Sequence, residues 1–292
     1  MLEIDLQKQE TIREAYGEIR GIGRTLTDLE RTRIGLENRF YAKLLDRLDD
    51  DCPSRSSGDF KLLCRSAYRD KIRDEDGRIV LDKDTLLPVD VPEEGAYEFL
   101  VKAEQSAITQ LEAMMLSLVG PNMQTFLDQV GIGTKSVSRL LGEIGHPIVA
   151  FPAHWEEGEE GENKKVLVED DPFMRRVSDL WSYCGHGDPS RKRARGMDQT
   201  DAMALGNPQA KMTVNQMAVR CVMKTERLSP TGKHMPASPY RLIYDIKREH
   251  YETARPEWKD AQKKGAAVRI TGKENLRDLY NAALKDLTEE AA

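Results

Sequence analysis

One stretch decides how the rest of the chain is organised: Gln129-Val130-Gly131-Ile132-Gly133-Thr134-Lys135-Ser136-Val137-Ser138-Arg139-Leu140-Leu141-Gly142-Glu143-Ile144-Gly145. We expect a tight turn between two short helices, because Gly131 and Gly133 can take the positive φ that a side chain resists. Thr134 is the predicted N-cap of the second helix, and Gly145 with Pro147 after it is its stop signal. One face of that helix is apolar, with the spacing of a buried stripe, at Val137, Leu140, Leu141 and Ile144.

This arrangement is the helix-hairpin-helix pattern, which predicts a phosphate site. Backbone N–H groups at the glycines and at the helix N-terminus can bind a phosphate, and Lys135 and Arg139 add positive charge beside them. Such contacts hold the nucleic-acid backbone and carry little sequence information. The predicted nucleic-acid-binding residues of the turn are Gly131, Ile132, Gly133, Thr134, Lys135, Ser136 and Arg139. The alternative interpretation is a compact connection between helices with no ligand.

Composition favours a helical protein with local, rather than general, affinity for polyanions. The chain has 292 residues, of which 39% are hydrophobic, 32% charged and 6% aromatic, a mixture typical of exposed helices around modest cores. Its net charge of −6 means that any nucleic-acid contact must come from local basic patches. The four cysteines are far apart, so we expect reduced thiols in a cytoplasmic protein, without a metal site or another cofactor. No apolar run predicts a membrane segment.

The N-terminal part predicts a long helical arm. Residues 1 to about 50 carry apolar positions three or four apart, and residues 96–118 carry a second stripe of this kind. A narrow stripe needs a partner helix, so we expect the two helices to pair as an antiparallel coiled coil and to form homo-oligomers. Residues 50–95 are predicted to be an irregular insertion. The first domain is therefore placed at 1–119 and a second, helical domain at 120–292.

The strongest local basic run follows the predicted short helix at 172–183. It reads Ser190-Arg191-Lys192-Arg193-Ala194-Arg195-Gly196, and no packed core would hold it. Although a solvated loop is the commoner role for such a run, Arg191, Lys192, Arg193 and Arg195 are predicted nucleic-acid contacts in a chain that is otherwise acidic. Three further helices are expected at 209–222, 240–254 and 271–287, so the predicted fold class is mainly α.

Residues from about 96 onward resemble the C-terminal domain of the DEDD-type transposases of the insertion-sequence-110/116/902 class. The family motif Pro-Gly-Ile-Gly, a helix, and Glu-Ile-Gly is similar to residues 130–133 and 143–145 here. Its Tyr-x-Gly-Leu-x-Pro element is similar to residues 183–189 with one extra residue, and its Gly-Asn pair at a helix start is similar to Gly206-Asn207. The resemblance implies DNA binding, with Asn207 and Lys211 among the contacts. The family's helical arms also resemble the segments before residue 119.

The departures from the family leave several functions open. No strand-rich segment or acidic quartet supplies the family's N-terminal nuclease-like domain. The family's catalytic serine precedes a glycine, whereas Arg195 precedes Gly196 here, and Ser190 is the nearest serine. We expect an accessory or non-catalytic protein that binds DNA or structured RNA. The alternatives are a recombinase that forms a covalent bond between Ser190 and DNA, and a structural helical assembly protein.

Overall fold

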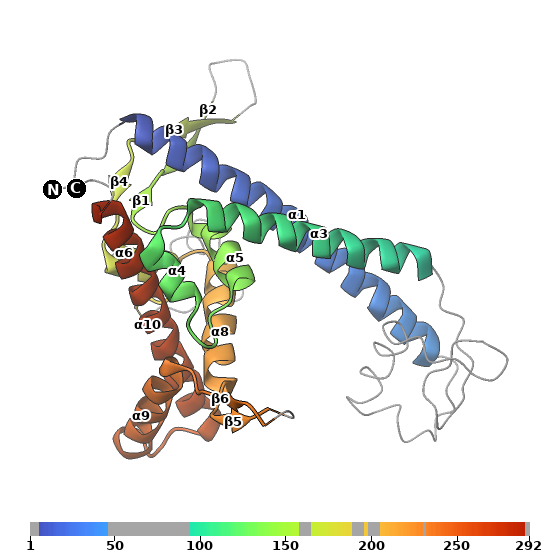
Figure 1. The fold of residues 1–292 in the computed structure, drawn as a ribbon, viewed down its shortest axis with the longest axis vertical. Coiled ribbons are helices and arrows are strands. Elements are labelled where there is room, and N and C mark those ends of the chain that lie inside the picture. The colour runs from blue at the N-terminus through green and yellow to red at the C-terminus, as the bar shows by residue number, and fades with distance from the viewer. Residues whose placement is uncertain are drawn as a thin grey trace. The chain divides into compact units, whose positions relative to one another are not determined.

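The protein is mainly α-helical, which confirms the predicted fold class (Figure 1). The computed structural model describes residues 6–45, 94–157, 165–188, 196–197, 205–229 and 232–289. Nearly all of the predicted insertion at 50–95 lies outside these ranges. No helix among the described residues combines the length and the apolar character that crossing a membrane requires.

The chain forms two compact units. One unit is Arg24–Thr109, and the other combines Met1–Gly23 with Gln110–Ala292. Two helices, α1 (Leu6–Leu45) and α3 (Glu94–Leu118), pass from one unit into the other. The domain boundary after residue 119 stays a prediction.

The unit Arg24–Thr109 contains an antiparallel pair formed by α1 and α3. The Nε atom of Arg33 donates to Glu104 Oε1 at 2.6 Å, and its Nη1 atom donates to Glu37. The Tyr97 hydroxyl donates to the same Glu37 carboxylate at 3.3 Å. Residue numbers therefore rise along one helix as they fall along the other. Both glutamates are buried, so this ionic cluster lies inside the helix pair.

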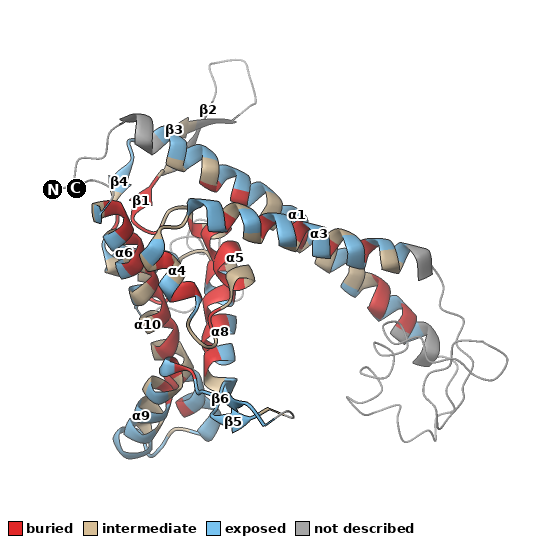
Figure 2. Ribbon diagram, in the orientation of Figure 1, coloured by how far each residue is buried: buried red, intermediate tan, exposed pale blue. Residues whose placement is uncertain are grey.

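The core of the larger unit lies among α4 (Pro121–Leu127), α5 (Thr134–Ile144), α8 (Pro208–Met223) and α10 (Asp260–Glu289). Helix α8 packs against both α5 and α10, and the buried residues of the three helices face one another (Figure 2). The predicted helix at 209–222 is confirmed within one residue at each end. The apolar stripe of α5 is buried as the sequence predicts: Val137, Leu140, Leu141 and Ile144.

Short strands connect the helices of this unit. The strand pairs of the described residues are antiparallel: β1 (Val149–Ala150) with β4 (Phe173–Met174), β2 (Ala153–Glu157) with β3 (Lys165–Glu169), and β5 (Arg227–Leu228) with β6 (His234–Met235). The predicted helix at 172–183 is wrong in its first part, because β4 occupies that segment and α6 spans only Val177–Tyr183. Pairing with β1 is a long-range contact, and the local apolar pattern does not reveal it.

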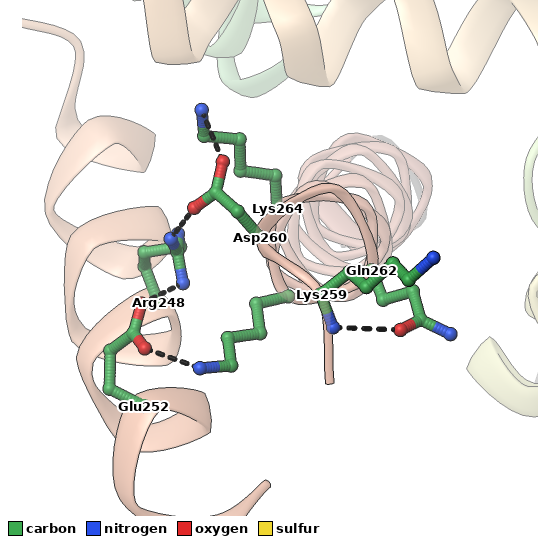
Figure 3. A network of polar contacts seen from close by, with 7 residues as sticks. Arg248, Glu252, Lys259, Asp260, Gln262 and Lys264 are labelled. Carbon is green, nitrogen blue, oxygen red and sulfur yellow. Dashed lines mark hydrogen bonds and ion pairs between the residues drawn. The ribbon is translucent and has the colours of Figure 1, made fainter. Parts of the chain in front are cut away.

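Helix α10 begins eleven residues before the predicted start at 271, and it follows α9 (Pro239–Ala254). The early part of α10 is charged and bonds across to α9 (Figure 3). Arg248 pairs with Glu252 and Asp260, and Lys263 Nζ lies 2.5 Å from Glu252 Oε2. Lys264 Nζ lies 2.7 Å from Asp260 Oδ2. The Arg248–Asp260 and Lys263–Glu252 pairs link the two helices, and the other two pairs lie within one helix each.

The end of α10 also caps the start of α4. Asp286 Oδ1 accepts the backbone N–H of Asn122 at 2.8 Å, and Oδ2 accepts that of Met123 at 2.9 Å. The first N–H groups of a helix have no partner within the helix, so this carboxylate satisfies two of them. Gly120 makes the contact possible, because a Cβ atom there would lie 2.4 Å from the carboxylate carbon.

Candidate nucleic-acid interface

The turn between α4 and α5 uses its two glycines differently. Gly131 has a φ of +96°, which is the left-handed conformation expected from the sequence. Gly133 has a φ of −151°, so the expectation of positive φ is wrong there. Ile132 is buried and its N–H donates to Gln129 O at 3.0 Å. One left-handed residue is enough to reverse the chain, and the extended Gly133 then leads into α5.

The inner side of this turn packs on α8. A Cβ atom at Gly131 would lie 2.8 Å from Cys221 Cα and 3.2 Å from Ser238 Oγ. Burial raises the pKa of the Cys221 thiol, so this contact is with an uncharged, inert group. The turn is thus partly covered, while Gly133, Thr134 and Lys135 remain half-exposed. The side of the turn that is offered to a ligand is the outer one, at the start of α5.

The N-terminus of α5 has no side-chain cap. Gly133, rather than Thr134, is the N-cap residue, which corrects the prediction: Thr134 is already the first residue of the helix. The first turn contains no acidic residue. No carboxylate of the first turn therefore offsets the positive end of the helix dipole, which favours an anion there.

Three cationic side chains lie on or against the first two turns of α5. Lys135 and Arg139 are half-exposed residues one helical turn apart on α5, but the Nε and Nη2 atoms of Arg139 are buried. Arg220, from α8, donates from Nη1 to Ser136 Oγ. Ser136 is buried, so its hydroxyl positions Arg220. The sequence reasoning missed Arg220. The only sign in the sequence that Arg220 is available for a contact is its position outside the apolar face of α8.

Asn207 has a structural role that the resemblance does not imply. Its Oδ1 atom accepts the N–H groups of Gln209 and Ala210 at 2.9 and 3.1 Å, so Asn207 is the N-cap of α8. Its Nδ2 atom donates to Glu143 Oε2 at 3.2 Å, which ties α8 to the end of α5. Capping accounts for this residue without a ligand.

The structure does not bring all of the predicted contacts together. Lys211 is exposed in the first turns of α8, nine residues before Arg220. At 3.6 residues per turn, nine residues are two and a half turns, so the two side chains lie on opposite sides of α8. Ser190, Arg191, Lys192, Arg193 and Arg195 lie outside the described residues. Their roles stay predictions.

Comparison with models of known protein families gives no match to this chain, and neither curated proteins nor solved structures give one. Among the described residues, no group of three or more His, Cys, Asp or Glu side chains is placed to hold a metal ion.

Proposed function

We propose that the protein binds the backbone of nucleic acid, foremost DNA, through the N-terminus of α5. The observation that carries this proposal is a helix start with no acidic residue in its first turn, next to Lys135 and Arg220, with Arg139 one turn further along α5. Backbone N–H groups and basic side chains are the groups that usually contact phosphates, and they give affinity without sequence preference.

The proposal includes a transposase-like domain with an accessory or non-catalytic role. The order of the elements supports it, since α4, the Gly131 turn and α5 precede a helix that opens at Gly206-Asn207. It also includes homo-oligomers formed through α1 and α3. Support for these comes from apolar side chains that the helix pair leaves exposed, above all Phe99 at 69%. We place the protein in the cytoplasm, because free cysteines such as Cys184 and Cys221 are usual there.

A titration of the full chain with duplex DNA at several salt concentrations tests the α5 site. The test variant is Lys135→Gln with Arg220→Gln. The control is Lys102→Gln with Lys285→Gln, which removes the same charge from exposed positions on α3 and α10. Each lost phosphate contact should reduce the slope of log affinity against log salt by about 0.9, so two contacts give a decrease of about 1.8.

The control variant should keep the wild-type slope. Equal slopes for all three proteins would reject the α5 site, and an equal decrease in both variants would show only a general charge effect. Parallel titrations with single-stranded DNA and structured RNA identify the preferred partner. If no nucleic acid binds at low salt while a stable oligomer forms, the structural-assembly alternative is favoured.

A further inference from the structure

A buried histidine follows α6. His186 is only 3% exposed, and neither of its ring nitrogens has a hydrogen-bond partner among the described residues. Its backbone N–H donates to Trp181 O at 2.7 Å. The ring lies against α10, because a Cβ atom at Gly272 would be 3.3 Å from His186 Cε1. Buried polar groups are almost always paired, so this imidazole requires an explanation.

Three cations from two helices approach α6 or the turn after it that carries His186. Arg269 Nη2, on α10, donates to the carbonyl oxygens of His186 at 3.1 Å and Gly187 at 2.7 Å. Lys273, one turn later on α10, has its Nζ atom 4.0 Å from the centre of the Trp181 ring. Lys211, on α8, lies against Gly185, where a Cβ atom would be 2.8 Å from Lys211 Cδ.

Lys211, Arg269 and Lys273 form no ion pair in the part of the chain that the structure describes. Burial and Arg269 lower the pKa of Lys273, and the nearby Glu274 carboxylate partly offsets this shift by raising it. Glu274 itself forms an ion pair with Arg277, so its charge is shared. Arg269 and Lys273 are four residues apart on one helix, a spacing at which like charges repel. Burial, then Arg269, Lys211 and Lys273, lower the pKa of His186 to about 4, so the imidazole is neutral at pH 7. A neutral imidazole keeps one N–H donor for a ligand.

We propose that Lys211, Arg269 and Lys273 form a second anion site, with His186 beneath them, that takes a phosphoryl group. Lys211 is exposed and the other two cations are half-buried, so solvent reaches the cations before the ring. Backbone carbonyls hold the arginine in place. Together with the two lysines, it suits an anion with several acceptor oxygens. The phosphoryl group belongs to a nucleotide or to a nucleic-acid backbone. The site is separate from α5, because Lys211 and Arg220 lie on opposite sides of α8.

Calorimetric titration of the full chain with inorganic phosphate at low salt tests this site. Wild type should bind, and Lys211→Gln with Lys273→Gln should weaken binding at least tenfold. The control Lys102→Gln with Lys285→Gln should bind as wild type does. The α5 variant Lys135→Gln with Arg220→Gln should also keep phosphate binding, so this site and the α5 site can fail independently. Absent binding in wild type, or equal binding in all variants, overturns the proposal.

The pKa of His186 gives a second measurement of phosphate binding. It would not respond to phosphate if Lys211 and Lys273 had only a structural role. Bound phosphate offsets the three cations, so the pKa of His186 should rise from about 4 when phosphate is added. The nuclear magnetic resonance signal is assigned by its absence in His186→Gln. If that variant does not fold, the signal is identified by its shift in Lys211→Gln with Lys273→Gln. A pKa that does not change with phosphate also overturns the proposal.

A duplex oligonucleotide, used as a competitor of phosphate, distinguishes the two sources of the phosphoryl group. Competition that depends on Lys211 and Lys273 supports the site with a nucleic-acid backbone as its ligand. Phosphate binding that the duplex does not displace supports the site with a small phosphorylated ligand.

Discussion

A Cβ atom on Gly131 would lie 2.8 Å from the Cα atom of Cys221, so the turn before α5 and helix α8 meet backbone to backbone. This contact fixes which side of the turn faces the core. It also leaves the start of α5, with Lys135, as the side that a ligand can reach.

Gly131→Ala should lower the free energy of unfolding by about 2 to 4 kcal/mol, because the new methyl group meets rigid backbone at a φ of +96°. Gly133→Ala is the matched control: its φ is −151° and nothing lies within 4 Å of a Cβ atom there. That change should cost less than about 1 kcal/mol. Urea denaturation measures both. Similar losses for the two variants would contradict the docking of the turn on α8.

Asp286→Ala should destabilise the protein by about 2 to 3 kcal/mol, because two backbone N–H groups at the start of α4 lose a charged acceptor. Glu289→Ala tests the same surface, since Glu289 bonds only to the exposed side chain of Asn122 among the contacts described. It should cost less than about 0.5 kcal/mol. Thermal unfolding of the two variants compares them, and a larger shift for Glu289→Ala would refute the capping role.

The free energy of unfolding should fall as the pH falls from about 6.5 to 4. The pKa of His186 is about 4 in the folded protein and near 6.5 in an unfolded chain, so between these values the unfolded chain binds more protons. The neutral His186 side chain contributes about 3 kcal/mol to the free energy of unfolding above pH 6.5, and this contribution is lost as the pH approaches 4. Urea denaturation of wild type and His186→Gln across this range measures it. If the difference in free energy of unfolding between wild type and His186→Gln does not change with pH, His186 is not buried as a neutral imidazole.

Arg33→Ala should cost about 2 to 3 kcal/mol, because the buried carboxylates of Glu37 and Glu104 lose the cation between them. Arg31→Ala removes a neighbouring arginine whose pair with Asp28, 3.6 Å apart, is exposed. That change should be within about 0.5 kcal/mol of wild type. Loss of helical circular dichroism on heating distinguishes them. Equal stability of the two variants would show that the ionic cluster does not hold α1 to α3.

Local signals in the sequence were sufficient for much of the fold. The apolar stripe of α5 and the stop at Gly145 were predicted correctly, since both depend on neighbouring residues. Helix α9 was also placed within one residue. The early start of α10 was missed because ion pairs with α9, rather than an apolar stripe, accompany its first turns.

The candidate sites depend on contacts that a sequence does not display. Arg220 approaches Ser136 across 84 residues, and Arg269 reaches the His186 carbonyl across 83. Asn207 has the residue type of a phosphate contact, but its amide is used in capping α8. The like-charged pair at 269 and 273 was visible in the sequence. Its proposed role as an anion site depends on the contact of Arg269 with the turn that carries His186, which the sequence does not show.

The capping of α4 by Asp286 has a consequence for synthesis. The ribosome makes residue 122 before residue 286, and 164 positions separate them. While the chain is still emerging, the first turn of α4 has to rely on water or a chaperone for its N–H groups. Helix α4, which leads into the turn before the proposed nucleic-acid site on α5, therefore reaches its finished form only after α10 has been translated.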